Sequence, residues 1–147
     1  IKLKKPRAQF VVVGNGPKYD TWKKKYQNVH FLGYKTGEEL SMIYASSDVF
    51  VFPSATETLG NVVLEAMASG LPVIVANKGG VLENVKHLHN GMIATHQNAI
   101  SYQAHMLMYF DDLDHYIQMR DKGLMHAKSK QWHVIFNQLL KLYQLKY

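Results

Sequence analysis

The chain has 147 residues, of which 47% are hydrophobic, 17 are Lys or Arg and 11 are Asp or Glu, which gives a formal net charge of +6. This length and apolar content fit one globular domain with its own core and exclude a disordered or collagen-like chain. Because Cys is absent, disulfide frameworks, thiolate metal sites and a Cys nucleophile are excluded, and we expect a cytoplasmic protein.

Neither a membrane-spanning segment nor a signal peptide is predicted. The longest apolar runs, Phe10 to Val13 and Val49 to Phe52, are far shorter than the roughly 20 residues that a spanning helix needs. The chain begins at Ile1 and its first Met is Met42. We therefore expect a fragment of a longer polypeptide, with residues 1–147 forming a single domain.

Five short apolar segments predict β-strands. They are rich in β-branched residues and do not alternate with polar residues, so we expect strands that are buried on both faces. Helical patterns separate them, which favours right-handed crossovers and an α/β fold with one parallel sheet covered by helices on both sides. The five segments are Gln9–Val13, Val29–Leu32, Asp48–Phe52, Pro72–Ala76 and Gly91–Ala94.

Two connecting helices have clear boundaries in the sequence. Thr36 and Glu39 have the spacing of a capping box, and the helix that they start is expected to end near Ser46. A second helix is predicted over residues 61–69, with Gly70 as a left-handed stop.

Beyond Thr95 the sequence has only helical periodicity. We expect breaks near Asp111 and at Lys122–Gly123, and a long final helix from about Lys128. An apolar stripe along that helix predicts packing against a core. The stripe consists of Trp132, Ile135, Phe136, Leu139, Leu140 and Tyr143.

The segment Pro53–Pro72 combines a turn after a strand with the start of a helix. Such turns lie at the carboxyl edge of a parallel sheet, where α/β proteins usually bind ligands. Amides at a helix start lack internal acceptors and the helix dipole adds positive charge there, so phosphate is favoured. Gly60 would let an anion approach the amides of Leu59, Gly60 and Asn61, or it could serve the turn alone.

Two carboxylates flank this turn. Glu57 precedes it, and Glu65 lies on the side of the helix opposite to the core-facing stripe. Carboxylates repel phosphate, but they accept hydrogen bonds from the hydroxyls of a ribose or a hexose. A ligand with a sugar, a diphosphate and a ribose would fit, while two ordinary surface acids are an equally good explanation of the spacing.

Glu57 and Glu65 form an E-x7-E pair within PSATETLGNVVLEAMASGLPVI, and this segment resembles the donor-site signature of retaining glycosyltransferases of family 4. Other blocks follow in the order of that family, so the resemblance covers nearly the whole chain. These blocks are VVVGNGP at 11–17, VHFLGY at 29–34, IYASSDVFVFPS at 43–54, GG at 79–80, NG at 90–91 and WHVIFNQLLKLY at 132–143.

The resemblance implies a Rossmann-like, C-terminal half of a GT-B fold that ends in helices. This half would bind a nucleotide sugar, such as a UDP-, GDP- or ADP-sugar, and would face an N-terminal acceptor domain of the same polypeptide. By motif, Glu57 is the catalytic candidate on the sugar hydroxyls and Glu65 binds the ribose. The resemblance also implies that backbone amides bind the sugar or the diphosphate, namely those of Leu59, Gly60, Asn61 and Val62. Gly33 and Tyr34 would lie near the nucleotide base, and Gly14 and Gly16 would line the same cleft.

Family members also place an Arg and a Lys on the phosphates, in a segment that precedes the first block found here. Lys4, Lys5 and Arg7 do not match its pattern. The fragment is therefore expected to bind donor weakly and to catalyse nothing alone. The resemblance implies transfer with retention of anomeric configuration, and no metal or other cofactor is expected.

Four other signals are weaker. Asp112-Leu-Asp114 resembles the DxD metal motif of a different glycosyltransferase fold, but we expect it to start a helix. Gly14-Asn-Gly16 lacks the third glycine of a dinucleotide motif, and His87-x-His89 lacks partners for zinc. The basic run Lys23–Lys25 favours solvated charge, with peripheral membrane contact next and nucleic acid disfavoured.

These observations predict the donor-binding domain of a retaining hexosyltransferase that acts on a glycan, lipid or polysaccharide precursor. Three alternatives remain. One is a nucleotide-sugar epimerase or phosphorylase of similar fold, and another is a sugar-nucleotide sensor or scaffold without turnover. The third is a glycoside hydrolase that uses the two carboxylates.

Overall fold

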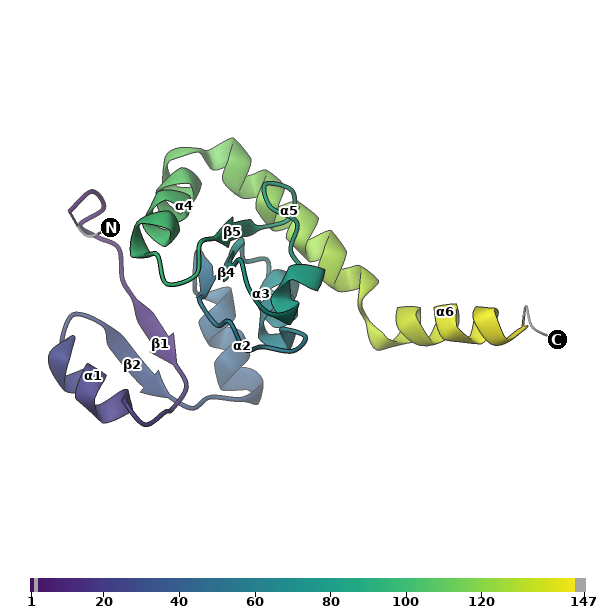
Figure 1. The fold of residues 1–147 in the computed structure, drawn as a ribbon, viewed down its shortest axis with the longest axis horizontal. Helices are drawn as coiled ribbons and strands as arrows, with labels where there is room; N and C mark the ends of the chain where they lie inside the picture. Colours follow the sequence, from purple (N-terminus) through teal and green to yellow (C-terminus); the bar gives the residue numbers. More distant parts are fainter. Residues whose placement is uncertain (2, 145–147) are drawn as a thin grey trace. The chain divides into compact units, whose positions relative to one another are not determined.

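The computed structural model describes residue 1 and residues 3–144. The chain divides into two compact units, residues 1–43 and residues 44–147. Figure 1 shows parallel strands and helices alternating along the chain, as the sequence predicts. The α/β class is confirmed, and the strands pair as a two-stranded parallel sheet in the first unit and as a three-stranded parallel sheet in the second.

The first unit contains a two-stranded parallel sheet. β1 (Val11–Val13) pairs with β2 (His30–Gly33), and α1 (Tyr19–Lys25) connects them. Tyr19 holds this helix to the sheet, because its ring packs edge-on against Phe31 and its hydroxyl donates a hydrogen bond to the Phe31 carbonyl oxygen at 3.1 Å. The next helix, α2 (Gly37–Ala45), leads into the second unit.

The expected burial of the first two strands is wrong. The three valines of β1 are 37–45% exposed, and α1 has no buried residue. The reason is that two strands and one short helix provide too few neighbours to cover both faces of the sheet.

The second unit is built around a fully buried strand. β4 (Val73–Ala76) lies between β3 (Phe50–Phe52) and β5 (Met92–Ala94), and all three run parallel. Every residue of β4 is 0% exposed. Three helices pack against this strand, namely α3 (Asn61–Ala68), α4 (Ala99–Asp111) and α5 (Leu113–Ser129). The core includes Ile74, Met92, Ala94, Tyr102, Tyr109 and Met119.

The helix that follows β3 agrees with its prediction. α3 runs from Asn61 to Ala68, and Gly70 has the left-handed backbone expected of a stop, with φ of 78°. Asn61, Glu65 and Ser69 are exposed on one side, while Val63, Ala66 and Met67 are buried on the other. The sequence therefore identified both the ends and the buried face of this helix.

The predicted break at Lys122–Gly123 is wrong, because α5 runs through it. Gly123 is buried, and a Cβ there would lie 3.4 Å from the Asn90 carbonyl oxygen and from Cγ of Met67. This glycine permits α5 to approach α3 closely and does not end the helix.

The last helix also differs from the expectation. α6 (Trp132–Gln144) begins after Lys128, which belongs to α5. Its apolar stripe is exposed, with Trp132 at 73% and Phe136 at 53%. Within the described residues the predicted packing of this stripe is therefore not found. No helix among the described residues is long and apolar enough to cross a membrane.

Candidate functional site

The predicted anion-binding turn leads from β3 into α3. Gly60 stands at the N-cap of α3 with φ of 75°, and its carbonyl oxygen accepts a hydrogen bond from the Val63 amide at 2.8 Å. A Cβ at Gly60 would lie 2.8 Å from Cγ1 of Val81. The glycine is thus required by the left-handed turn and by the packing of Val81. These contacts support the turn as a reason for the glycine, and its use in letting an anion approach the backbone stays a prediction.

The amides at the start of α3 are available to an acceptor. Among the described residues we find no acceptor for the amides of Leu59, Asn61 and Val62, as expected at the first turn of a helix. The Gly60 N–H donates a hydrogen bond to Oε1 of Glu57 at 3.4 Å. A carboxylate oxygen therefore already lies at one of the amides that the sequence assigned to an anionic ligand.

Gly79 and Gly80 lie directly against the backbone of this turn. The Gly80 amide donates a hydrogen bond to the Glu57 carbonyl oxygen at 2.8 Å. A Cβ on Gly79 would lie 3.0 Å from the Ala55 carbonyl oxygen, and a Cβ on Gly80 would overlap the Thr58 carbonyl oxygen. Only glycine allows these two backbone segments to lie so close together, which gives the GG block a structural role.

Glu65 is positioned by a tyrosine that the sequence analysis did not assign to the site. The Tyr44 hydroxyl donates a hydrogen bond to Oε2 of Glu65 at 3.4 Å and lies 3.5 Å from the Val62 carbonyl oxygen. Burial, followed by the charge of Glu65 and this hydrogen bond, raises the pKa of Tyr44 to about 12. Tyr44 therefore stays protonated and donates. The available signal was a tyrosine on a buried helix face, where its hydroxyl needs a partner.

Asn84 is a second functional candidate that the sequence analysis missed. It follows the 3-10 helix η1 (Gly80–Glu83) and is 2% exposed. Its side-chain Nδ2 donates a hydrogen bond to the Leu59 carbonyl oxygen at 2.7 Å. The main-chain carbonyl oxygen of Asn84 accepts a hydrogen bond from Nδ2 of Asn90 at 2.9 Å. The segment between the GG and NG blocks, VLENVKHLH, mixes apolar and polar residues, so the burial of Asn84 had no clear signal in the sequence. Once buried, its amide must be hydrogen-bonded.

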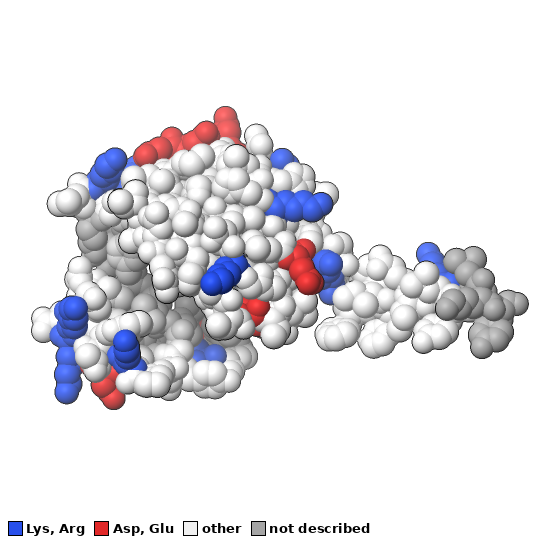
Figure 2. All heavy atoms as spheres, viewed as in Figure 1, with Lys and Arg blue, Asp and Glu red and all other residues white. Residues whose placement is uncertain are grey.

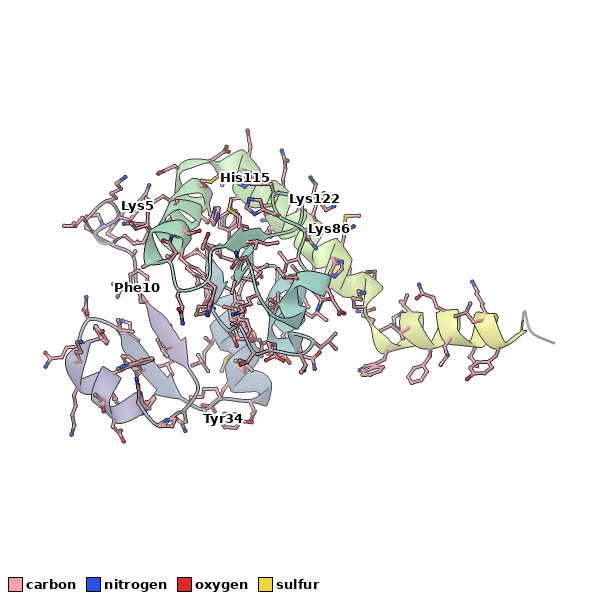
Figure 3. The ribbon with its side chains drawn as sticks, in the orientation of Figure 1. Lys5, Phe10, Tyr34, Lys86, His115 and Lys122 are labelled. Atoms are coloured by element: carbon pink, nitrogen blue, oxygen red, sulfur yellow. The ribbon has the colours of Figure 1, made fainter. Side chains whose placement is uncertain are left out.

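A basic hollow lies elsewhere on the second unit. Its volume is about 480 Å³, and Figure 3 labels two of its lysines, Lys86 and Lys122, beside α5. Neither lysine forms an ion pair with a described residue. It contains neither Glu57 nor Glu65, so it is distinct from the predicted site. The lining residues are Lys86, His89, Asn90, Lys122, Met125 and His126.

The predicted site residues of the first unit also come together. The Gly14 amide donates a hydrogen bond to the Gly33 carbonyl oxygen at 2.7 Å, and the Gly16 carbonyl oxygen accepts from the Tyr19 amide. Tyr34, labelled in Figure 3, follows β2 and is 72% exposed. These residues lie at the carboxyl ends of β1 and β2. That they share one cleft with the turn before α3 stays a prediction.

The acidic pair that resembled a metal motif starts a helix, as predicted. Asp112 is the N-cap of α5, and its Oδ1 accepts a hydrogen bond from the His115 amide at 2.9 Å. Figure 2 shows acidic side chains gathered over the turn between α4 and α5, where Asp111, Asp112 and Asp114 lie. Among the described residues, no three His, Cys, Asp or Glu side chains are arranged to hold a metal ion.

The fold and this turn define an α/β protein with an anion-favouring helix start flanked by two carboxylates. Residues 1–112 match the family described as glycosyl transferases group 1, and the chain belongs to this family. It is 32% identical over 138 residues to a GDP-mannose-dependent alpha-mannosyltransferase of Corynebacterium glutamicum, which covers 92% of this chain and 33% of that protein. It is 50% identical over 80 residues to the sulfoquinovosyl transferase SQD2 of Arabidopsis thaliana, which covers 53% of this chain and 16% of that protein.

Known structures agree with the GT-B fold that the sequence implied. Sucrose-phosphate synthase of Thermosynechococcus elongatus matches with a TM-score of 0.81 and 26% identity, over 97% of this chain and 39% of that one. The C-terminal domain of a group 1 glycosyl transferase (LpcC) of Francisella tularensis matches with a TM-score of 0.77 and 23% identity, over 88% and 72%. Anabaena HepE in complex with UDP matches with a TM-score of 0.78 and 23% identity, over 97% and 42%. The chain thus spans between a sixth and a third of the two curated relatives.

Proposed function

We propose that this chain is the donor-binding domain of a retaining glycosyltransferase that transfers a hexose from a nucleotide diphosphate sugar. The observation that carries the proposal is the start of α3, between Glu57 and Glu65, where several backbone amides have no acceptor among the described residues. Membership of a glycosyltransferase family supports it. The remaining cationic groups and the acceptor site come from polypeptide outside residues 1–147, since the chain spans only part of its relatives.

In this proposal the amides at the start of α3 receive the diphosphate. As the bond to the sugar breaks, negative charge grows on the departing diphosphate, and preorganised N–H groups stabilise it. The helix dipole adds to this stabilisation, and the cationic groups from outside residues 1–147 neutralise the rest of the charge, so we expect no metal ion to be required. Glu65, oriented by Tyr44, accepts hydrogen bonds from the ribose hydroxyls.

Glu57 changes partner when the donor binds. In the unliganded chain its Oε1 accepts a hydrogen bond from the Gly60 amide. An oxygen of the donor replaces the carboxylate at this amide, and the released carboxylate accepts a hydrogen bond from a sugar hydroxyl. A carboxylate suits this task because it has only acceptor sites.

Screening donors against the full-length enzyme identifies the nucleotide base and the sugar of the donor. Thermal shift with UDP-, GDP- and ADP-sugars ranks the donors, because a ligand that binds only the folded state raises Tm. The relatives indicate which to include, since HepE was crystallised with UDP-glucose and the Corynebacterium enzyme is described as GDP-mannose-dependent. Incubation with the best donor then measures transfer to a sugar acceptor and the configuration of the product.

The roles of the two carboxylates are tested by Glu57→Gln and Glu65→Gln in the full-length enzyme. Each should lower kcat/KM for transfer at least about tenfold, because each removes a charged acceptor from the donor. Glu38→Gln, which changes an exposed acid of α2, should leave transfer unchanged. Wild-type turnover in both site variants would reject the assignment of the site.

The same assay separates the alternative functions. Epimerised donor would indicate an epimerase, and release of a sugar phosphate would indicate a phosphorylase. Hydrolysis of an oligosaccharide without nucleotide would indicate a glycosidase. Donor binding without any turnover would indicate a sensor or scaffold.

A further inference from the structure

We propose that Asn84 is a positioning residue, which holds the Leu59–Gly60 peptide so that its N–H points to the anionic part of the ligand. This inference rests on the proposed function of the turn before α3. Asn84 is 2% exposed, and its Nδ2 donates a 2.7 Å hydrogen bond to the Leu59 carbonyl oxygen. The two residues are 25 positions apart, so the bond links the turn to a different part of the second unit.

Because the peptide group is planar, the hydrogen bond to the Leu59 carbonyl oxygen also fixes the direction of the Gly60 N–H. In a trans peptide the C=O and the following N–H point in opposite directions. The chain has no cis peptide bond among the described residues. Holding the Leu59 carbonyl oxygen at Asn84 therefore directs the Gly60 N–H away from Asn84. That N–H meets Oε1 of Glu57 at 3.4 Å, so an acceptor already occupies the direction that Asn84 sets.

Asn84 is itself held by groups that determine which way its amide faces. The Leu59 carbonyl oxygen can only accept, so Nδ2 of Asn84 must face it and Oδ1 must face His126, whose Nε2 lies 3.4 Å away. Nε2 of His126 is therefore the donor. Burial, Lys130 and Lys86 lower the pKa of His126, so the neutral ring with its proton on Nε2 serves at neutral pH.

A neighbouring asparagine provides the comparison that separates positioning from simple stability. Asn90 is 3% exposed, and its Nδ2 donates to the Asn84 carbonyl oxygen at 2.9 Å while its Oδ1 accepts from the Lys86 amide at 2.7 Å. It is as buried and as well bonded as Asn84, but it makes no bond to the turn. Asn→Asp at either position removes one buried amide donor, and only Asn84→Asp releases Leu59.

The first measurement needs no ligand. We expect the ¹⁵N order parameter of Gly60 to fall from about 0.85 in the wild type to below about 0.6 in Asn84→Asp, and to stay near the wild-type value in Asn90→Asp. If Asn84→Asp does not fold, His126→Leu removes the donor to Asn84 Oδ1 and should lower the Gly60 value in the same direction. A Gly60 amide that stays rigid in the folded variant would overturn the proposal.

The second measurement uses UDP, GDP and ADP as probes of the full-length enzyme. Asn84→Asp should weaken the affinity of the best probe by about tenfold or more, while Asn90→Asp should weaken it by less than about threefold at a similar loss of Tm. Equal weakening in both variants would reduce Asn84 to a structural residue and overturn the proposal. If the wild type binds none of the three nucleotides, the proposed function fails, and the Gly60 order parameter still decides whether Asn84 positions the turn.

Discussion

The two units of the chain build parallel strands from nearly the same residues and bury them very differently. β1 has the sequence Val-Val-Val and is 37–45% exposed, whereas the Val-Ile-Val at the start of β4 is 0% exposed. β4 has a strand on each side and three helices against it, while among the described residues of the first unit β1 pairs with β2 alone. The burial of an apolar strand is therefore decided by how many elements surround it.

The same contrast applies to the residues of the proposed site. The turn before α3 is held from several directions, by Gly80, Asn84 and the Val81 side chain. In the first unit the loops after β1 and β2 are joined by the bond between Gly14 and Gly33, and Tyr34 is exposed. The turn before α3 is thus held by more contacts than the loops of the first unit, and the predictions below test this difference.

The largest effect is expected for Gly80→Ala. The new Cβ would overlap the Thr58 carbonyl oxygen, and a backbone atom cannot move aside as a side chain can. We expect a loss of about 3 kcal/mol in the free energy of unfolding, measured by urea denaturation, because overpacking strains the turn. Gly16→Ala in the first unit is the control, because its Cβ would meet nothing within 4 Å. Equal stability of the two variants would contradict the tight packing of the turn.

The second prediction compares the same substitution in the two sheets. Val75→Ala, at 0% exposure, should lower the free energy of unfolding by about 2 kcal/mol, because it removes two buried methyl groups and leaves a cavity. Val12→Ala, at 38% exposure, should cost less than about 1 kcal/mol. Chemical denaturation of both variants measures the difference. Equal costs would indicate that β1 is buried in solution.

The third prediction concerns the starts of the helices. α5 has the side-chain cap Asp112, whereas the N-cap of α1, Lys18, makes no such bond. Asp112→Ala should therefore cost about 1 kcal/mol in the free energy of unfolding, and Lys18→Ala should be close to neutral. Asp112→Asn keeps an acceptor and should retain most of the stability. A Tm of the wild type that rises with Mn²⁺, and does not rise in Asp112→Ala, would instead favour a metal motif.

The smallest effect is a change in alkaline stability. The pKa of Tyr44 is raised from its ordinary 10.0 to about 12 in the folded chain, so deprotonation favours the unfolded state. Its contribution to stability is complete below pH 10 and is lost as the pH rises toward 12. Tyr44→Phe should reduce this loss, as measured by unfolding at several pH values. Tyr34→Phe, on an exposed side chain, should keep the wild-type profile.

Local sequence patterns were sufficient for most of the elements. The five predicted strands all occur, and α3 has the predicted ends, because apolar runs and a glycine stop act within a few residues. The errors occur where the role of a residue depends on a contact with a residue far away in the sequence. Gly123 was expected to break a helix, but it lies inside α5 and allows close contact with Met67.

The same distinction holds for the site. The motif around Glu57 and Glu65 identified the turn, and the exposed side of α3 followed from helical spacing. Tyr44 and Asn84 were missed as site residues because their partners are 18 to 25 positions away. A hydrogen bond across that separation leaves no periodic signal in the sequence.

By itself the amino-acid order determined the class of fold, the positions of strands and helices, and the family to which the chain belongs. Only the tertiary structure decided that Gly60 serves the turn, that Gly80 meets the Thr58 carbonyl oxygen, and that Asn84 holds Leu59. The physical reason is the sequence separation over which each interaction acts. Periodicity and turn chemistry act between neighbours along the chain, whereas burial and hydrogen-bond partners depend on which segments the fold brings together.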